Sequence, residues 1–334
     1  MNSPIGNFIS VIRVAMLLSI TSIIFLVCAI ILLTTHKSLK KQIDLNAAPH
    51  LIKDLWHAPD TLSIANDEIG TQIKYGKELI VHTARYLGPK GSVLQISNGM
   101  NCQNCHLEAG TKPFGNNYGS VASLYPKYRA RSGNLESIEK RVNDCIERSL
   151  NGQAIDSLSK EMRAIVAYIM WIGKDVPIGE KAKGSGLIDI TYLPRQADSV
   201  KGKILYKSTC SSCHGENGEG VKRFNGVDYV YPPVWGANSF NVGAGLYRIS
   251  NFSKYIRSNM PLGATYKNLT LTEEDAWDIA AYVVSLPRPE KLFLTDWPKL
   301  ETKPVDHPIG PYADTFNVAQ HKYGPFIPIL KSLK

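Results

Sequence analysis

Hydrophobic and polar residues divide the chain into one continuously apolar segment near the N-terminus and two longer segments that share a pattern. The twenty residues from Val14 to Leu33 carry no charge, which is enough for a helix to cross a bilayer. This run is long for a signal peptide, and the TTHKSLKK that follows has no small-residue cleavage site. We therefore predict a retained signal anchor, or transmembrane helix, over residues 1–40, with cleavage as the alternative.

Each of the two similar segments ends in a predicted amphipathic helix. Apolar residues recur at i, i+3, i+4, i+7 and i+8 in the first, and the second begins at a capping box formed by Thr272 and Asp275. The predicted core positions are Met162, Ile165, Val166, Ile169 and Met170, and then Ile279, Ala280, Val283 and Val284. A short helix opens each segment, over residues 76–87 and 201–206, and an irregular Gly-rich stretch follows it.

A Cys-x-x-Cys-His motif stands in each segment, as NCQNCH and TCSSCH. This is the attachment pattern of c-type haem. Two thiols three residues apart on one turn can both reach the porphyrin vinyl groups, and the next residue directs its imidazole at the iron. A zinc site or a redox dithiol is the alternative for a single motif, but two copies in the same context favour two covalently bound haem c groups. The residues concerned are Cys102, Cys105, His106, Cys210, Cys213 and His214.

The repeated plan predicts a mainly α fold with two tandem cytochrome c domains after the transmembrane helix. We expect a first domain at 41–175, a Gly- and Pro-containing linker at 176–199, a second domain at 200–290 and a Pro-rich coil packed on the domains at 291–334. Because haem c is attached outside the cytoplasm, we expect both domains on the periplasmic side of the bacterial inner membrane. This argument overrides the lysines after the apolar run, which favour the opposite orientation.

Met260 is the candidate distal ligand in the second domain. It is the only Met after the second motif, no His lies between them, and Pro261 and Gly263 predict a ligand-presenting loop. His/Met ligation gives a high-potential haem that transfers electrons.

Cys145 is the corresponding candidate in the first domain. No His lies between the first motif and the linker, and the two Met residues there fall on the predicted core face of the closing helix. Tyr168 and Tyr282, which align the closing helices, are 114 positions apart, and Cys145 and Met260 are 115 apart. A buried free thiol is the alternative. A disulfide is not expected, because the only other unassigned cysteine, Cys28, lies in the apolar span.

Basic residues surround Cys145 along the sequence. The segment NLESIEKRVNDCIERSLNG predicts a helix with Asn134 as a possible N-cap, so that Arg141, Cys145 and Ser149 share one face. Arg131 precedes this helix. Two arginines beside a sulfur atom would bind an oxyanion through charge-assisted hydrogen bonds and would lower the pKa of the thiol. A solvated basic surface is the alternative.

Composition narrows the partners only slightly. Hydrophobic residues make up 44% and charged residues 20%, which excludes a mainly disordered chain, and six cysteines are too few for a disulfide scaffold at this length. The net charge of +9 indicates anionic partners without choosing among nucleic acid, phospholipid and small anions. With the motifs above, we expect small anions and no nucleic acid.

Together these motifs make the chain similar to the dihaem thiosulfate dehydrogenases, some of which also act as tetrathionate reductases. The likeness runs from about residue 65 to the C-terminus and includes NCQNCH, RVNDCIERSLNG, YPPVWG, GAGLYRISNFSKYIRSNMPLG and HKYGPF. It implies an active-site haem ligated by His106 and Cys145, and a second haem, ligated by His214 and Met260, that passes electrons outward. The pocket residues that it implies are Arg131, Arg141 and Ser149.

The reaction implied by the resemblance is the oxidation of two thiosulfate ions to tetrathionate, or its reverse, with a periplasmic or membrane redox partner such as a cytochrome c or a terminal oxidase. Some relatives carry a Lys before the Met ligand and switch to it on reduction. This chain has Asn259 there, so we expect no such switch.

Three other functions fit part of the pattern. The chain could be a physiological tetrathionate reductase, a membrane-tethered electron-transfer cytochrome without its own substrate, or a sulfur-oxidation cytochrome that loads a carrier protein. An anion pocket beside the haem argues against a simple electron carrier.

We predict that the full-length protein stays with membranes after a high-salt wash and is released only by detergent, because Val14–Leu33 is uncharged and long enough to span the bilayer. Fractionation followed by immunoblotting measures this. A mature N-terminus downstream of residue 30, found by mass spectrometry, would instead establish cleavage.

Overall fold

The computed structural model describes residues 4–46, 55–224 and 226–333. The chain divides into two units, Met1–Ala48 and Pro49–Lys334. Residues 47–54, at the start of the predicted first domain, lie outside the described part of the chain, as do both terminal ends. The described residues are mainly helical, as the sequence predicts.

The first unit is dominated by one helix, α1 (Pro4–Asn46). Its segment Arg13–Leu39 has a mean hydropathy of 2.9 and is long and apolar enough to cross a membrane. Its described apolar side chains are exposed, and Phe25 is 77% exposed. The predicted membrane-spanning segment is therefore present as a helix. Its exposed apolar side chains require an apolar environment such as the interior of a bilayer.

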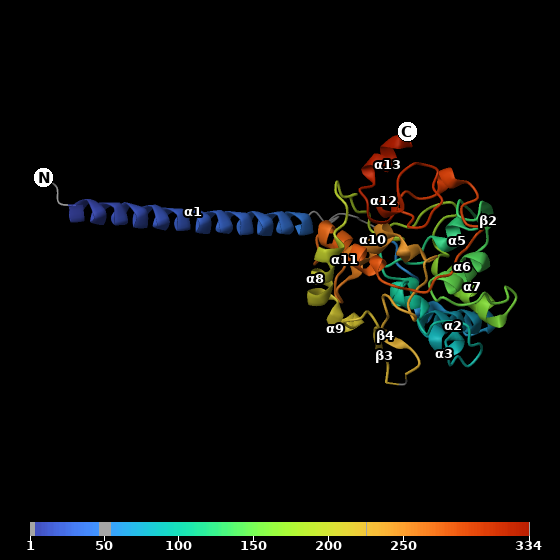
Figure 1. Cartoon of the computed structure of the whole chain (residues 1–334). Helices are drawn as coiled ribbons and strands as arrows, with labels where there is room; N and C mark the ends of the chain where they lie inside the picture. The colour runs from blue at the N-terminus through green and yellow to red at the C-terminus, as the bar shows by residue number, and fades with distance from the viewer. Residues whose placement is uncertain (1–3, 47–54, 225, 334) are drawn as a thin grey trace. The chain divides into compact units, whose positions relative to one another are not determined.

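The second unit contains two halves with a common plan, one around each Cys-x-x-Cys-His motif (Figure 1). The helices of the first half are α2 (Glu68–Val81), α3 (Thr83–Leu87), α4 (Leu107–Gly110), α5 (Val121–Leu124), α6 (Ile138–Arg148) and α7 (Lys160–Ile172). Those of the second half are α8 (Ser199–Thr209), α9 (Ser211–His214), α10 (Ile249–Asn259) and α11 (Glu273–Ser285). Each half also holds one antiparallel hairpin, β1 (Lys127–Arg129) with β2 (Asn134–Glu136), and β3 (Val221–Lys222) with β4 (Tyr229–Tyr231).

In each half the opening helix crosses the closing helix at a glycine. A Cβ added to Gly76 in α2 would lie 1.9 Å from the carbonyl oxygen of Ala164 in α7. A Cβ added to Gly202 in α8 would lie 1.8 Å from that of Asp278 in α11. The backbones therefore approach this closely only because no side chain stands between them. The matching crossings explain why the two segments share one sequence pattern.

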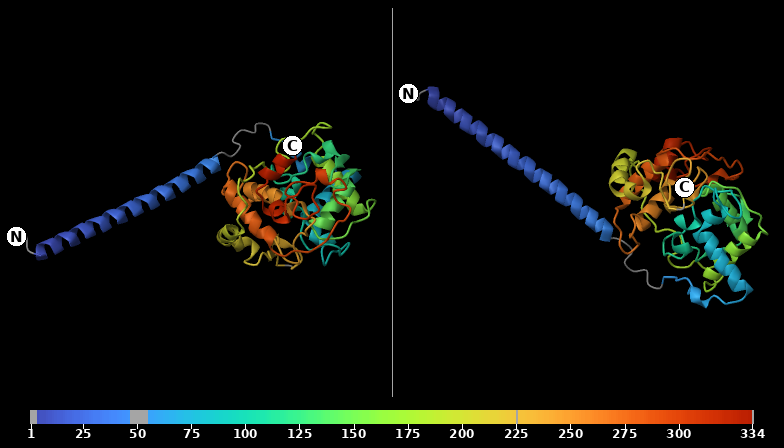
Figure 2. Two further views of the ribbon diagram at one scale, coloured as in Figure 1. Left: turned by 45° about the horizontal axis from the view of Figure 1, so that its top comes forward. Right: turned by 90° about the horizontal axis from the view of Figure 1, so that it is seen from below.

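The two halves lie side by side, the cyan and green first half against the yellow and orange second half (Figure 2). Hydrogen bonds join them at the first motif. The Tyr255 hydroxyl in α10 donates to the carbonyl of Asn104 over 2.8 Å, and the Asn259 amide donates to the carbonyl of Phe114 over 3.0 Å. The helix that precedes Met260 is therefore fixed against the loop that carries the first haem motif.

The C-terminal segment bonds to both halves but is not only the predicted coil. It contains two short helices, α12 (Val318–Tyr323) and α13 (Ile327–Ser332). Asp296 accepts two hydrogen bonds of 2.8 Å from Arg148 in the first half. Asp306 accepts from Arg248 in the second half over 2.9 Å. Phe326 is buried and packs these last helices into the core. The sequence did not predict this contact, because the apolar run around Phe326 is short and lies among prolines.

The structure corrects the predicted start of the helix around Cys145. Residues 134–136 form strand β2, and α6 begins after Ser137, whose hydroxyl accepts from the backbone N–H of Lys140 over 3.3 Å. Asn134 is therefore not the N-cap, because its backbone pairs with Arg129 across the turn at Gly133. The prediction for Met170 was also wrong, since it is 44% exposed and lies off the core face of α7.

Candidate functional site

A cavity of about 180 Å³ lies beside the first motif and gathers most of the predicted active-site residues. Helix α6 contributes Arg141 and Cys145, and its C-cap Ser149 lies one turn further along the same face. The motif contributes His106 from the other side. The predicted i, i+4 spacing therefore brings these side chains into one cavity, although the helix starts later than expected.

The His106 ring is held in one orientation. Its Nδ1 lies 2.5 Å from the carbonyl oxygen of Asn116, and Tyr118 stacks on the ring with centroids 4.5 Å apart. An Nδ1–H that donates to a carbonyl leaves Nε2 as the nitrogen that can ligate a metal. Neither Asn116 nor Tyr118 was singled out from the sequence, because a backbone acceptor and a stacked ring leave no motif.

Cys145 and His106 line the same cavity. Burial alone would raise the pKa of this thiol, but the Arg141 guanidinium and His106 outweigh burial and lower the pKa to about 7. Cys145 in turn raises the pKa of Arg141, although burial acts in the opposite direction. The cavity therefore favours a thiolate beside a permanent positive charge.

The other basic residues near Cys145 lie outside the lining of this cavity. Arg131 donates from Nη1 to the carbonyl of Gly243 in the second half over 3.1 Å, and its guanidinium lies 5.5 Å from the ring centre of Trp297. Burial lowers the pKa of Arg131 to about 10, and the charges of Arg148 and Arg141 act in the same direction. Lys140 is half-exposed and pairs with Asp144. Arg131 thus adds charge near the cavity, and Lys140 belongs to the solvated surface.

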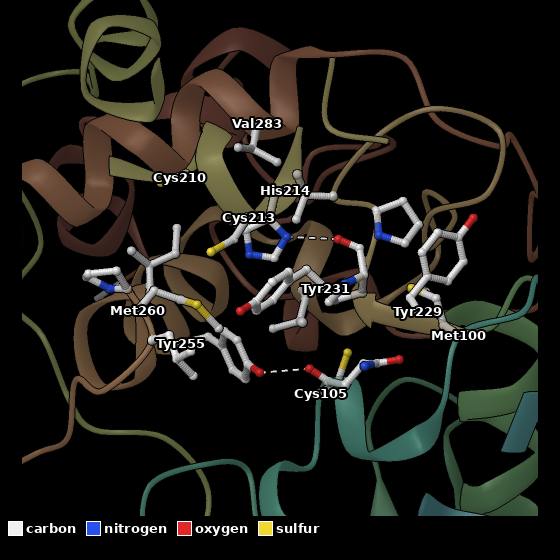
Figure 3. Close-up of a pocket in the computed structure, with 18 of the residues that line it drawn as sticks. Met100, Cys105, Cys210, Cys213, His214, Tyr229, Tyr231, Tyr255, Met260 and Val283 are labelled. Carbon is white, nitrogen blue, oxygen red and sulfur yellow. Dashed lines mark hydrogen bonds between the residues drawn. The ribbon is translucent and has the colours of Figure 1, made fainter. Parts of the chain in front are cut away.

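The second motif opens onto a larger cavity of about 300 Å³. Figure 3 shows His214 and Met260 around this cavity, together with Tyr229, Tyr231 and Tyr255. The Nδ1 of His214 lies 2.8 Å from the carbonyl oxygen of Pro232, so Nε2 is again the free ring nitrogen. Burial lowers the pKa of His214, which favours the neutral imidazole needed for ligation.

The two candidate distal ligands come from different local structures. Cys145 projects from within a helix, whereas Met260 follows the last residue of α10 in an extended conformation. Both line a cavity together with the histidine of their half. The alignment by closing helices placed each candidate in one cavity with the histidine of its half, but it did not foresee that the chain reaches the two places differently. Ligation by Cys145 and Met260 stays a prediction.

The donor sets of both cavities fit haem c. Each motif folds as one turn. The backbone N–H of His106 donates to the carbonyl of Cys102 over 3.0 Å, and the backbone N–H of His214 donates to the carbonyl of Cys210 over 2.9 Å. All four motif thiols are free of disulfides. A histidine with a free Nε2 and a sulfur atom from another element complete each cavity. Cys105 lies in the wall of both cavities, which sequence spacing alone could not show.

Comparisons with known proteins agree with this geometry. Residues 94–178 match the family model described as "SoxA/TsdA, cytochrome c domain", and residues 199–287 match the model for cytochrome c. The thiosulfate dehydrogenase of Psychrobacter arcticus is 37% identical over 241 residues, which cover 72% of this chain and 71% of the relative. The chain belongs to the thiosulfate dehydrogenase family. With two cytochrome c domains, this family member holds two covalently bound haem c groups.

Two further relatives support membership in the family. The thiosulfate dehydrogenase of Allochromatium vinosum is 38% identical over 218 residues, covering 64% of this chain and 79% of the relative. The solved thiosulfate dehydrogenase TsdBA of Marichromatium purpuratum, in its as-isolated form, superposes with a TM-score of 0.67 at 26% identity over 81% of this chain. That match spans only 54% of the solved chain, which is therefore considerably longer than the shared part.

Met260→Gly is expected to change the midpoint potential of the second haem and to slow electron delivery to an acceptor, because the predicted sulfur ligand in the cavity of His214 is lost. The apparent affinity for thiosulfate should stay nearly the same, since Cys145 and Arg141 line the other cavity. Redox titration and steady-state kinetics measure the two effects. A large loss of affinity with normal electron delivery would mean that the roles of the two haems are reversed.

Arg141→Gln is expected to raise the KM for thiosulfate about ten- to a hundredfold, because a charge-assisted hydrogen bond is worth roughly 1.5–3 kcal/mol and each 1.4 kcal/mol is about a factor of ten. Arg131→Gln should act in the same direction but less, since Arg131 does not line the cavity. Lys140→Gln is the control and should change little. Equal small effects in all three variants would identify the basic run as a solvated surface only.

Proposed function

We propose that this chain oxidises two thiosulfate ions to tetrathionate at the cavity that contains Cys145. The observation that carries this proposal is the placement of a partly buried cysteine of lowered pKa in one cavity with Arg141 and His106. An electron-transfer protein without a substrate has no need of a charged group in this position. The curated relatives are named for thiosulfate, which supports this choice of anion.

Binding of the substrate is assigned to Arg141 and Ser149. Thiosulfate is a dianion, and the planar guanidinium of Arg141 can donate two parallel hydrogen bonds to its sulfonate oxygens. Ser149 lies four residues after Cys145 on the same face and offers a neutral hydroxyl donor. Arg131, although it does not line the cavity, adds positive charge to its surroundings and favours the approach of an anion.

Cys145 is assigned the covalent step. Its thiolate and the outer sulfur of the first thiosulfate form an S–S bond as two electrons are removed, which gives a cysteine S-thiosulfonate. The outer sulfur of a second thiosulfate then attacks the sulfur attached to Cys145. The new S–S bond forms tetrathionate, and the electron pair of the broken bond returns to Cys145 as thiolate. The pKa of about 7 makes the thiolate available both as nucleophile and as leaving group.

The haem c groups, when bound, supply one-electron redox centres with His106 and Cys145 as ligands at the first and His214 and Met260 at the second. Cys105 lines both cavities, so the electrons have a short route from the first half to the second. His/Met ligation suits the second centre to deliver them to an acceptor. The reverse reaction, tetrathionate reduction, would use the same residues.

The apolar helix supports a membrane location. We assign the two cytochrome domains to the periplasmic side of the inner membrane, tethered through Arg13–Leu39. Such a tether keeps the protein close to a cytochrome c or terminal oxidase that accepts its electrons.

Cys145→Ala is expected to keep both haems covalently attached but to abolish turnover with thiosulfate, because the nucleophile and the sulfur ligand are lost together. Turnover with thiosulfate and an electron acceptor, and with tetrathionate and a reduced donor, measures the loss in both directions. The wild type should show a low-spin thiolate-type EPR signal that the variant lacks. The matched control is Cys28→Ala, whose thiol lies in the apolar helix. Normal activity in Cys145→Ala would end this mechanism.

A further inference from the structure

Asp228 is a buried carboxylate of the second half that none of the roles above uses. It is 5% exposed and stands directly before strand β4. Its carbonyl oxygen accepts from the backbone N–H of Arg223, which directly follows β3, over 2.8 Å. This bond fixes the backbone at Asp228, and the side chain remains in the interior.

The carboxylate of Asp228 bonds to one residue from the lining of each haem cavity. Its Oδ2 accepts from Nδ2 of Asn101 over 3.3 Å and from Nε of Arg223 over 3.1 Å. Asn101 lines the cavity that contains Cys145, and Arg223 lines the cavity beside the second motif. Asp228 is therefore one hydrogen bond away from the wall of both cavities.

The bond to the first cavity is rigid at its Asn101 end. Asn101 is 2% exposed and directly precedes the first motif. Its Oδ1 accepts from the backbone N–H of Ala84 over 2.8 Å, and its own backbone N–H donates to Oδ1 of Asn104 over 2.7 Å. The amide group is therefore held on both sides, and its Nδ2 remains directed at Asp228.

The negative charge of Asp228 is compensated only in part. Both donors share Oδ2, whereas Oδ1 is buried and has no hydrogen-bond partner among the described residues. The buried carboxylates of Asp278 and Asp306 differ, because both oxygens of each accept hydrogen bonds. The side chain of Arg223 is half-exposed, so solvent screens its charge more than it screens that of Asp228.

A buried negative charge acts on a haem without touching it. A haem gains one negative charge when it takes up an electron, and Coulomb repulsion makes this step less favourable near a carboxylate in a medium of low dielectric constant. We propose that Asp228 lowers the reduction potentials of both haem c groups, so that one side chain between the two cavities adjusts both centres together. This proposal depends on haem binding and not on the reaction with thiosulfate.

The test compares Asp228→Asn with Asp189→Asn in the full-length protein, with both haems attached and no thiosulfate present. Asn at position 228 keeps an oxygen that can accept from Asn101 and Arg223, so the substitution removes mainly the charge. In a redox titration followed by absorption and EPR spectra, we expect the ratio of reduced to oxidised haem at a fixed ambient potential to rise at both haems. The expected rise is about three- to tenfold, and tenfold is about 59 mV for a one-electron couple. Asp189 also pairs with a cation, Lys254, but is 97% exposed, so its loss should change little.

A second pair of variants changes the potentials in the opposite direction. Arg223→Gln leaves the charge of Asp228 without its cation, so the ratio should fall at both haems. Lys222→Gln is the control, because Lys222 is the adjacent cation and lies 5.6 Å from the ring centre of Tyr229. If Asp228→Asn does not give folded protein, this pair decides the question. A rise at only one haem in Asp228→Asn, a shift no larger than that of Asp189→Asn, or an effect of Arg223→Gln confined to the second haem would overturn the proposal.

Discussion

The wall that the two cavities share at Cys105 is the constraint on which the rest of the structure depends. Two redox centres exchange electrons rapidly only if the two halves keep a fixed distance and orientation. Side chains of the second half fix that geometry by bonding to backbone atoms of the first, as Tyr255 does with Asn104 and Asn241 with Glu147. Side chains of the first half bond across the same interface, as Arg131 does with the carbonyl of Gly243 over 3.1 Å, so the geometry depends on bonds given from both halves.

At the first cavity, burial and charge act against each other. Burial disfavours a thiolate at Cys145 and also disfavours an unpaired guanidinium at Arg141. Placed together, each compensates for the charge of the other. In the proposed reaction, an anion that enters this cavity meets an arginine already held beside Cys145, so little reorganisation is needed when it binds.

The sequence predicted those features that depend on spacing along one element. The Cys-x-x-Cys-His turns, the apolar faces of α7 and α11 and the shared face of Arg141, Cys145 and Ser149 are local, and apart from the exposed Met170 the structure has them as predicted. The capping bond of Thr272, which accepts from the N–H of Asp275 over 3.0 Å, is likewise present. Each depends on residues within a few positions of one another.

The features that the sequence did not predict depend on distant partners. The sequence predicted Asn134 as a helix cap, but Asn134 pairs with Arg129 in a strand, and this partner could not be recognised from the sequence around Cys145. The sequence predicted Arg131 as a residue of the pocket around Cys145. In the structure its guanidinium donates to the carbonyl of Gly243 in the other half, and Arg131 does not line the cavity of Cys145.

The C-terminal segment determines how small a working piece of this protein can be. Arg148 and Arg248 belong to different halves, yet both take their carboxylate partners, Asp296 and Asp306, from this last stretch of chain. Either half cut out alone would keep its haem motif but lose an ion pair: Arg248 would lose Asp306, and Arg148 would keep only its 3.9 Å pair with Asp144. Each cytochrome domain therefore depends on the segment that follows the second one for part of its ion pairing, so neither is a self-contained module.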